Sequence, residues 1–377
     1  MKLSVIVPAY NEEATILDLL AEVESAPLPN SITLEIVVVN DASQDKTAEV
    51  LAPLASNPRY IIKHHRVNQG KGAALRTGYA AATGDIILVQ DADLEYSPSE
   101  YMHLIGPILD GKADAVYGSR FLSDRPHRVL YFWHRIANGM ITLMSNMFSD
   151  LNFTDVETCY KAFRKSAIEG IVIEENRFGF DPEITAKIGH LAYHRKLRVY
   201  EVGISYFGRT YEEGKKIGLR DAFRAFWCIM LYSTTGFARM IKYSVGEIVT
   251  ALVQFALFYP LFFSAIGLST LFRIAPFPTN FYLAIASIVT LTTFISPWLH
   301  RHWTWRPVLT PINHPAQNKN PQKAISFYLY LSLMAALKTA FIITVLPQEG
   351  LIVTLALGCL IQILSFAVYE SLSKPSR

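Results

Sequence analysis

The feature that most constrains this chain is a short apolar segment, residues 86–90, which acidic residues follow at once. Gly84 lies just before it, and the composition is typical of a strand buried in a parallel sheet. Asp91, Asp93 and Glu95 then stand at the carboxyl end of that strand, where open α/β sheets bind their ligands. The sequence therefore predicts an α/β fold with a polar site at this edge.

The acidic loop supplies hard oxygen ligands. Carboxylates suit Mg²⁺ or Mn²⁺, which are often held by one or two carboxylates together with substrate phosphates. In a regular strand Asp91 and Asp93 would point to opposite faces. They share one site only if the chain turns there, or one binds metal while the other binds sugar or ribose hydroxyls. A solvated acidic turn is the alternative, and the rest of the chain weighs against it.

Strands and helices alternate through the first part of the chain. The apolar runs 3–7, 35–39 and 60–63 are expected to be strands, with helices over 46–54 and from the glycine-rich turn to Ala82. This alternation predicts a parallel sheet with helices on both faces. The first helix is expected to be capped by Asn11, with Glu12 and Glu13 in its first turn. Its expected buried residues are Ile16, Leu17, Leu20 and Val23.

The turn Gly70-Lys71-Gly72 admits two interpretations. It is not a phosphate-binding loop of the G-x-x-x-x-G-K-[ST] type, and Leu75 replaces the third glycine of a dinucleotide fingerprint. Either the glycines allow a tight turn into the next helix, or Lys71 and its neighbours contact a phosphate. Both interpretations remain open from the residues alone.

Composition limits the function classes. The 377 residues are enough for two domains, and a hydrophobic content of 51% is high for a soluble protein. The net charge of +3 gives no sign of a nucleic-acid partner. Cys159, Cys228 and Cys359 lie far apart, which argues against a disulfide framework or a zinc ribbon and suits a reducing compartment.

Eight motifs occur in a fixed order along the first 235 residues. They are VPAYNEE, VVVNDASQD, NQGKGAAL, VQDADLEYSP, YGSRF, TDVETCYKAFR, RFGFDPEI and FGRTYEEGKKI. The ordered set resembles family 2 glycosyltransferases with a GT-A fold, and within them the dolichyl- and polyprenyl-phosphate sugar synthases. Glu95 departs from this pattern, because dolichyl-phosphate mannose synthases often carry glutamine there. The sugar is therefore left open between mannose and glucose types.

The resemblance assigns roles to individual residues. Asp41 would contact the base of the nucleotide, and Asp93 would be the main metal ligand, assisted by Asp91 and Glu95. Arg209 and Lys215 would reach the diphosphate, although a solvated basic loop is the alternative for Lys215. The nucleotide-sugar site implied in this way comprises Pro8, Tyr10, Glu12, Asp41, Lys71, Asp91, Ala92, Asp93, Arg209 and Lys215.

The acceptor implied by the resemblance is a polyprenyl phosphate bound by Arg120 and Arg135. Its phosphate monoester has a second pKa near ~6, so its oxygen is already anionic at neutral pH and hardly needs a general base. A single in-line displacement with inversion then suffices, as in the resembled family. Asp155 is our candidate for an active-site role, whereas Asp181, placed before Pro182, fits a helix N-cap at least as well.

Residues 127–148 are expected to form a helix on the membrane surface. The stretch has no acidic residue, it carries Trp133 within an apolar face, and Arg128 and Arg135 supply positive charge. An ordinary amphipathic helix on the sheet is the alternative. A second interfacial helix is expected near residues 217–242.

The last third of the chain reads as a membrane domain. Four apolar stretches near 248–272, 281–299, 325–346 and 351–369 each approach the ~20 residues needed to cross a bilayer. Basic residues gather in the middle loop, which places that loop, both termini and the catalytic domain in the cytoplasm. Residues 240–377 resemble a GtrA-like domain. Lys338 is an ionisable group well inside one stretch.

The resulting hypothesis is a multi-pass enzyme of the cytoplasmic membrane that moves a hexose from a GDP- or UDP-sugar to dolichyl or polyprenyl phosphate. We also consider a homo-oligomer. A processive polysaccharide synthase is one alternative, although its usual Q-x-x-R-W motif is absent. The other is a lipid-linked sugar transporter or scaffold that has lost catalysis, which the intact Asp91 and Asp93 oppose.

Overall fold

The computed structural model describes residues 1–122, 128–129, 132–208, 219–246, 248–250, 252–253 and 303. The chain divides into two compact units, of which the first holds the residues up to Ala238 and the second begins at Arg239. Within the described ranges, no helix has both the length and the apolar character that a membrane span requires. The four expected spans and the GtrA-like domain fall almost entirely outside these ranges, so they stay predictions.

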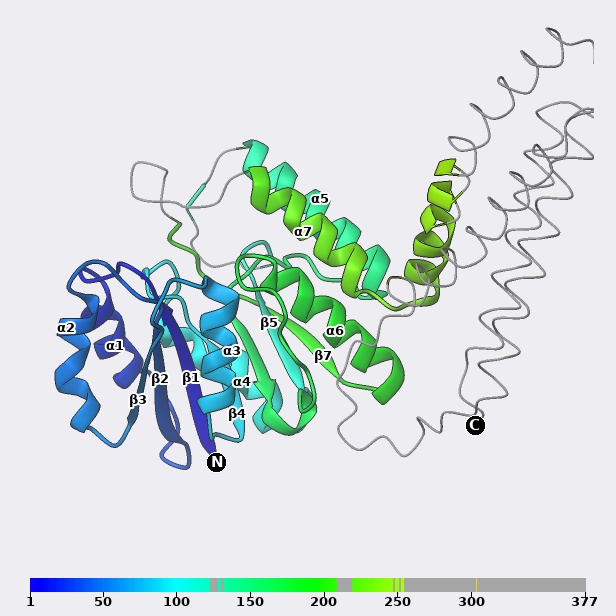
Figure 1. Cartoon of the computed structure of the whole chain (residues 1–377). Coiled ribbons are helices and arrows are strands. Elements are labelled where there is room, and N and C mark those ends of the chain that lie inside the picture. Colours follow the sequence, from blue (N-terminus) through cyan, green and yellow to red (C-terminus); the bar gives the residue numbers. More distant parts are fainter. Residues whose placement is uncertain are drawn as a thin grey trace, which may run out of the picture. The chain divides into compact units, whose positions relative to one another are not determined.

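The first unit is built on a mixed sheet of seven described strands in the order β3-β2-β1-β4-β6-β5-β7 (Figure 1). Strand β6 is antiparallel to β4 and β5, and the other neighbours are parallel. This confirms the expected α/β fold, and the sheet is mixed and mainly parallel because β6 alone of the described strands runs antiparallel to its neighbours. The strands are β1 Lys2–Ala9, β2 Thr33–Asn40, β3 Tyr60–His64, β4 Ile86–Val89, β5 Ala115–Ser119, β6 Lys161–Arg164 and β7 Val199–Gly203.

Helices cover both faces of this sheet. On one face Tyr79 packs against Phe163 of β6 and Phe180 of α6. On the other, Tyr101 of α4 packs against Tyr160, just before β6. The helices are α1 Ile16–Glu24, α2 Thr47–Leu51, α3 Lys71–Ala81, α4 Tyr101–Leu109, α5 Phe132–Ser149, α6 Phe180–Arg195 and α7 Leu219–Tyr232, with 3-10 turns η1 Ala52–Ser56, η2 Pro98–Glu100 and η3 Lys165–Ala167.

The central strands lack the alternation of a half-exposed sheet. Val5 of β1 lies opposite Ile36 of β2 and Leu88 of β4, and all three are fully buried. Continuous runs of β-branched and leucine residues form such strands because both faces are covered by helices. The middle of the sheet is therefore a fixed platform, and the loops at its carboxyl edge are free to carry polar groups.

The start of α1 corrects one prediction. The helix begins at Ile16 rather than near Asn11, whose φ is 55°. The side chain of Asn11 instead accepts a hydrogen bond from the backbone N–H of Gln44, and the N–H of Glu12 donates to Thr47. Because the loop is held against the end of β2, it enters the helix one turn later.

This later start moves the buried face of α1. Leu17 is 46% exposed, and Leu19 joins Ile16, Leu20 and Val23 in the core instead. Glu12 and Glu13 precede the helix, so they do not occupy its first turn.

Candidate active site

A cleft of about 540 Å³ lies at the carboxyl edge of the sheet, beside the ends of β1, β2 and β4. Most of the residues that the sequence singled out line it. Asp155 and Arg135 are described but do not line it, and Arg209 and Lys215 lie outside the described residues. The lining members of the expected set are Pro8, Tyr10, Glu12, Asp41, Lys71, Asp91, Ala92, Asp93, Glu95 and Arg120.

A turn directly after β4 brings the two aspartates to one site. Gln90 is fully buried, and its side-chain oxygen accepts hydrogen bonds from the hydroxyls of Tyr101 and Tyr160 at 2.9 and 2.8 Å. The chain then turns, and Leu94 adopts a φ of 61°. Asp91 and Asp93 therefore line the same cleft, and the strict alternation of a strand does not apply to them.

Lys71 is the first residue of α3, and its ammonium group lies 2.7 Å from the carboxylate of Asp91. Burial opposes the charged lysine, but the negative charge of Asp91 raises the pKa of Lys71 well above its usual value. Lys71 therefore stays positively charged beside the acidic turn, which comprises Asp91, Asp93 and Glu95.

The glycines of this turn meet a close neighbour. Gly70 has a φ of 99°, and a Cβ there would stand 2.4 Å from the carbonyl oxygen of Asn176. A Cβ on Gly72 would stand 2.2 Å from the carbonyl oxygen of Glu175. The close approach of backbone therefore explains the glycines, and the charge that faces the cleft comes from Lys71.

Asp41 is engaged by the protein itself. Its carboxylate lies 2.6 Å from Nδ1 of His65 and accepts hydrogen bonds from the backbone N–H groups of Gln69 and Gly70. These bonds hold the loop that precedes α3 against the end of β2. Asp41 thus shapes the wall of the cleft, and contact with a nucleotide base stays a prediction.

Arg120, which lines the cleft, forms a two-point ion pair with Asp155. Nε and Nη2 of Arg120 donate to the two carboxylate oxygens at 2.6 and 2.8 Å, and Asp155 is fully buried. The loop that carries Asp155 is fixed by Glu201 of β7, which accepts its backbone N–H. The guanidinium group of Arg120 also has a hydrogen bond with the side chain of Tyr206, which lines the same cleft.

Arg135 reaches the same neighbourhood from α5. Its guanidinium carbon lies 3.6 Å from the ring centroid of Phe121, and that of Arg120 lies 5.5 Å from the same ring. The two arginines expected to bind the acceptor phosphate therefore border one aromatic side chain.

The proposed metal ligands do not form a cluster of three. Glu95 accepts a hydrogen bond from the hydroxyl of Tyr206 at 2.9 Å. Within the described part of the chain, no group of three or more His, Cys, Asp or Glu side chains is placed to hold an ion. Asp91 and Asp93 still offer hard oxygens on one cleft, so the residues fit an ion that takes its other ligands from substrate phosphates and water.

Two motifs contribute residues that were not assigned from the sequence. TDVETCYKAFR adds Glu157 and Cys159 to the cleft, and RFGFDPEI adds Arg177, Phe178 and Asp181. The other unassigned lining residues are Ala9, Asn68, Gln69, Gly70, Ala74, Tyr96 and Tyr206.

Asp181 has a different role from the one expected. Helix α6 begins at Phe180 with Gly179 as its N-cap, so Asp181 lies inside the first turn. Its carboxylate accepts a hydrogen bond from Lys161 at 2.5 Å, and Lys161 is fully buried. Asp181 is thus the counter-ion of a buried lysine and not a helix cap.

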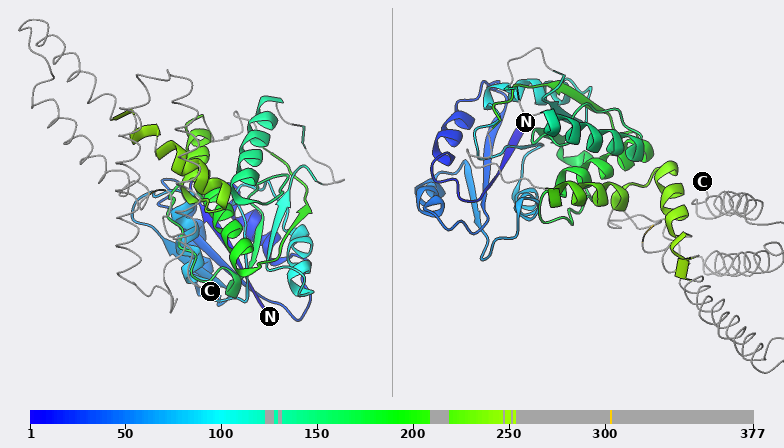
Figure 2. Two further views of the ribbon diagram at one scale, coloured as in Figure 1. Left: turned by 90° about the vertical axis from the view of Figure 1, so that its right-hand side faces the viewer. Right: turned by 90° about the horizontal axis from the view of Figure 1, so that it is seen from above.

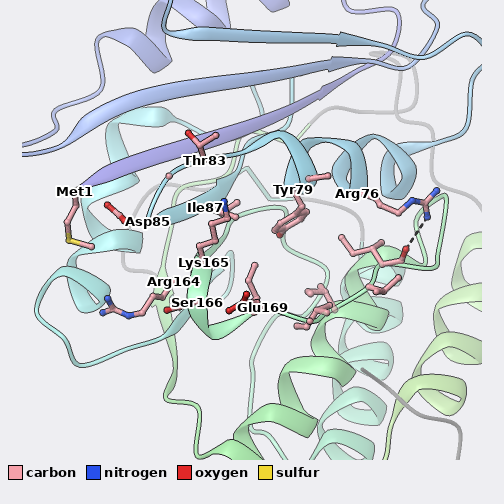
Figure 3. A pocket seen from close by; sticks show the side chains of 18 residues that line it. Met1, Arg76, Tyr79, Thr83, Asp85, Ile87, Arg164, Lys165, Ser166 and Glu169 are labelled. Atoms are coloured by element: carbon pink, nitrogen blue, oxygen red, sulfur yellow. Dashed lines mark hydrogen bonds between the residues drawn. The ribbon is translucent and has the colours of Figure 1, made fainter. Parts of the chain in front are cut away.

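A second hollow, of about 690 Å³, lies at the opposite edge of the sheet (Figure 3). Met1, Asp85 and Ile87 mark it as the amino end of β4. Its basic side chains are engaged, because Arg76 donates to the carbonyl of Ile173 and Lys165 to that of Ala82. The acidic turn and Arg120 face the first cleft, which is therefore the candidate active site.

Comparisons with known proteins bear on the enzyme class. The model of the family described as Glycosyl transferase family 2 matches residues 4–172, a range that contains the acidic turn, Arg120 and Asp155. An undecaprenyl-phosphate 4-deoxy-4-formamido-L-arabinose transferase of Pseudomonas aeruginosa is 28% identical over 257 residues, which cover 68% of this chain and 72% of the relative.

Two further relatives act on dolichol-type lipids by their names. A dolichyl-phosphate beta-glucosyltransferase of Trichomonas vaginalis is 32% identical, covering 54% of this chain and 65% of its own length. A dolichol-phosphate mannosyltransferase of Pyrococcus furiosus is 31% identical, covering 58% of this chain and 61% of its own length.

Among solved structures, glucosyl-3-phosphoglycerate synthase from Mycobacterium tuberculosis, in complex with Mn²⁺, UDP and phosphoglyceric acid, is 21% identical. It aligns with a TM-score of 0.44 over 56% of this chain and 72% of its own. The family model matches residues 4–172, and the named relatives are glycosyltransferases, so the comparisons support the enzyme class: the protein is a glycosyltransferase.

Proposed function

We propose that the protein transfers a hexose of the mannose or glucose type from a nucleoside-diphosphate sugar to dolichyl or polyprenyl phosphate, with inversion at the anomeric carbon. The observation that carries this proposal is the layout of one cleft. The acidic turn with Lys71 lies at the ends of the central strands, and Arg120 lines the same cleft. Two anionic substrates can therefore be held together.

The donor is proposed to bind between β1, β2 and the acidic turn. Pro8 and Tyr10 line this part of the cleft with Glu12, beside the loop that Asp41 holds. Lys71 would face the diphosphate, as would Arg209 and Lys215 of the FGRTYEEGKKI motif by the resemblance. The three cations would offset the negative charge of the departing nucleoside diphosphate.

Charge in the cleft supports a role for Mg²⁺ or Mn²⁺. The described lining contains seven carboxyl groups and three cationic side chains, namely Lys71, Arg120 and Arg177. A nucleoside diphosphate adds further negative charge, so a divalent ion is needed for the site to bind it well. We propose that Asp91 and Asp93 hold this ion, with Glu95 nearby. When bound, it would stabilise charge on the leaving diphosphate.

The acceptor phosphate is proposed to lie against Arg120 and Arg135. Arginine suits a phosphate because its planar group donates two parallel hydrogen bonds. Asp155 would act through Arg120, because its two-point ion pair fixes the plane of the guanidinium group. The acceptor oxygen is already anionic, so none of these residues has to remove a proton from it.

The surface next to the proposed acceptor site supports a membrane-bound acceptor. Helix α5 exposes an apolar stripe at alternating three- and four-residue spacing, whereas its buried residues are Thr142, Ser145, Phe148 and Ser149. The stripe consists of Trp133, Ile136, Met140, Leu143 and Met147.

Helix α7 packs beside α5 (Figure 1, Figure 2). Its side chains Phe223, Phe226 and Trp227 are exposed. Water-facing apolar side chains on two adjacent helices, with Arg128 just before α5 and Arg135 in its first turn, fit the surface of a bilayer. We propose that both helices lie on the cytoplasmic face of the membrane and that the expected spans and GtrA-like domain anchor the chain there.

The test is incubation of the purified chain with a panel of GDP- and UDP-hexoses and either polyprenyl phosphate or a soluble phosphate monoester. We expect a lipid-linked monosaccharide, identified by its mass, whose anomeric configuration is opposite to that of the donor. Transfer only to the soluble acceptor would refute the lipid assignment. A lipid product with retained configuration would refute the single displacement. The absence of transfer from every donor would favour the transporter or scaffold alternative.

A further inference from the structure

Glu157 lines the cleft, and one of its carboxyl oxygens has no hydrogen-bond partner among the described residues. It lies in the turn between Asp155 and the start of β6, and it lines the cleft with Arg120. Its Oε1 atom is buried and has no hydrogen-bond partner among the described residues. A buried carboxylate oxygen without a donor is costly, so this group needs either a proton or a ligand.

The cations around Glu157 are already paired with other acids. Arg120 holds Asp155 at 2.6 Å, and Lys161 holds Asp181 at 2.5 Å. Of the charged groups around it, these four have the largest effect on the carboxyl group of Glu157. These two cations are shared among three carboxyl groups. Glu157 is the carboxyl group left without a cationic partner in the described part of the chain, so it is the one favoured to be neutral.

The electrostatics of the site agree with this pairing. Burial raises the pKa of Glu157, and the negative charges of Asp181 and Asp155 raise it further. Lys161 and Arg120 oppose the shift, and the net pKa is about 8. At pH 7 the carboxyl group is therefore mostly protonated, and it ionises as the pH rises through 8.

We propose that Glu157 is held as a neutral carboxylic acid and donates a hydrogen bond to the acceptor phosphate on Arg120. This inference rests on the proposed function, because that function supplies the phosphate monoester. The site must bring two anionic substrates together. A neutral donor contributes a hydrogen bond without adding charge, whereas an ionised Glu157 would repel the incoming phosphate.

The test uses the full chain in detergent and geranyl phosphate, a short isoprenyl monophosphate, with binding measured by calorimetry at pH 7 and pH 9. The phosphate is dianionic at both values, since its second pKa is near ~6, so its own titration does not affect the comparison. Ionisation of a group with a pKa of about 8 leaves roughly a tenth of it neutral at pH 9. The dissociation constant of the wild-type chain should therefore rise about tenfold.

Glu157→Gln keeps a neutral donor of the same shape. It should bind within about threefold of the wild-type chain at pH 7 and lose the tenfold dependence on pH. Glu157→Ala removes the donor and should bind about tenfold more weakly at pH 7. The matched control is Glu49→Gln on the exposed side of α2, which should keep the wild-type pH dependence.

Three outcomes would overturn the inference. They are a wild-type affinity that does not change with pH, a Glu157→Gln variant that keeps the tenfold dependence, and a folded Glu157→Gln variant that does not bind at pH 7. Turnover is scored separately on the same samples. If binding follows the expected pattern but no sugar reaches any lipid, the proposed function is wrong. The inference that neutral Glu157 donates a hydrogen bond to a phosphate monoester would still hold.

Discussion

The proposed donor site and the proposed acceptor site differ in whether a buried polar atom is left without a partner. At the donor site, Asp41 is bonded to His65 and the loop before α3, and Asp91 is paired with Lys71. At the acceptor site, Oε1 of Glu157 has no partner among the described residues, and α5 turns an apolar stripe to water. We infer that the donor site is built in advance, whereas the acceptor site is completed by a lipid phosphate and its bilayer.

The largest effect is expected at the acidic turn. Asp93→Asn removes a carboxylate that is proposed to hold the metal, and kcat/KM for the nucleotide-sugar should fall by about a thousandfold. Steady-state turnover with excess Mg²⁺ measures this. Asp110→Asn at the exposed end of α4 is the matched control and should leave turnover unchanged. If Asp93→Asn kept full activity in buffer freed of divalent ions, the metal assignment would be wrong.

Glu35, a buried acid far from the cleft, shows how a preformed hydrogen-bond network contributes to the free energy of unfolding. Glu35 is 4% exposed. It accepts hydrogen bonds from Ser4 and Thr83, and it forms an ion pair with Lys2. Burial alone would raise its pKa, but these partners together lower the pKa of Glu35 to about 2.

Because the folded pKa of Glu35 lies below the unfolded one, its contribution to the free energy of unfolding is present above pH 4.5 and is lost as the pH falls through about 2. Glu35→Gln should therefore lower the free energy of unfolding at pH 7 and have little effect near pH 2. Thermal unfolding at both pH values measures this, with Glu49→Gln as the control. An equal loss at both pH values would contradict the assigned pKa.

The acceptor site is probed by Arg120→Lys. Lysine keeps the charge but loses the two-point pairing, so KM for the lipid phosphate should rise about 30-fold while KM for the nucleotide-sugar stays the same. Arg198→Lys is a matched control, because Arg198 makes the same two-point pair with Asp114 away from the cleft. An equal rise in both KM values would show that the two sites are not separable.

The smallest effect is expected on the apolar stripe. Trp133 is 75% exposed, and Trp133→Ser should raise KM for a long-chain acceptor in vesicles about fivefold, since one aromatic contact with the bilayer is lost. KM for geranyl phosphate should not change. Tyr193→Ser, an exposed aromatic on α6, serves as the control. A rise of the same size for the short acceptor would count against a membrane-facing helix.

Much of the donor site could be predicted from the sequence, because its residues follow strands directly. Asp41 comes one residue after β2, and Asp91 two after β4, and parallel strands align such positions at one edge. The sequence predicts that Asp91 and Asp93 share a site if the chain turns between them, and in the structure the chain turns there and both line the cleft. Their roles in binding stay predictions.

The acceptor site could not be predicted in the same way, because its pairs join distant parts of the chain. Arg120 meets Asp155 from 35 residues away, and Lys161 takes Asp181 as counter-ion from the first turn of α6. Only these pairings show that Glu157 is left without a cationic partner among the described residues, so its unpaired oxygen could not be predicted from the sequence. Local rules also failed at Asn11, since its contact with the loop after β2 outweighs its tendency to cap a helix.

The most direct test of the account is the stoichiometry of the reaction in nanodiscs with and without polyprenyl phosphate, with nucleoside diphosphate and lipid-linked sugar measured in the same sample. The account predicts one lipid-linked sugar for each nucleoside diphosphate released, and almost no release when the lipid phosphate is left out. Equal release in both kinds of nanodisc, without a lipid product, would contradict it.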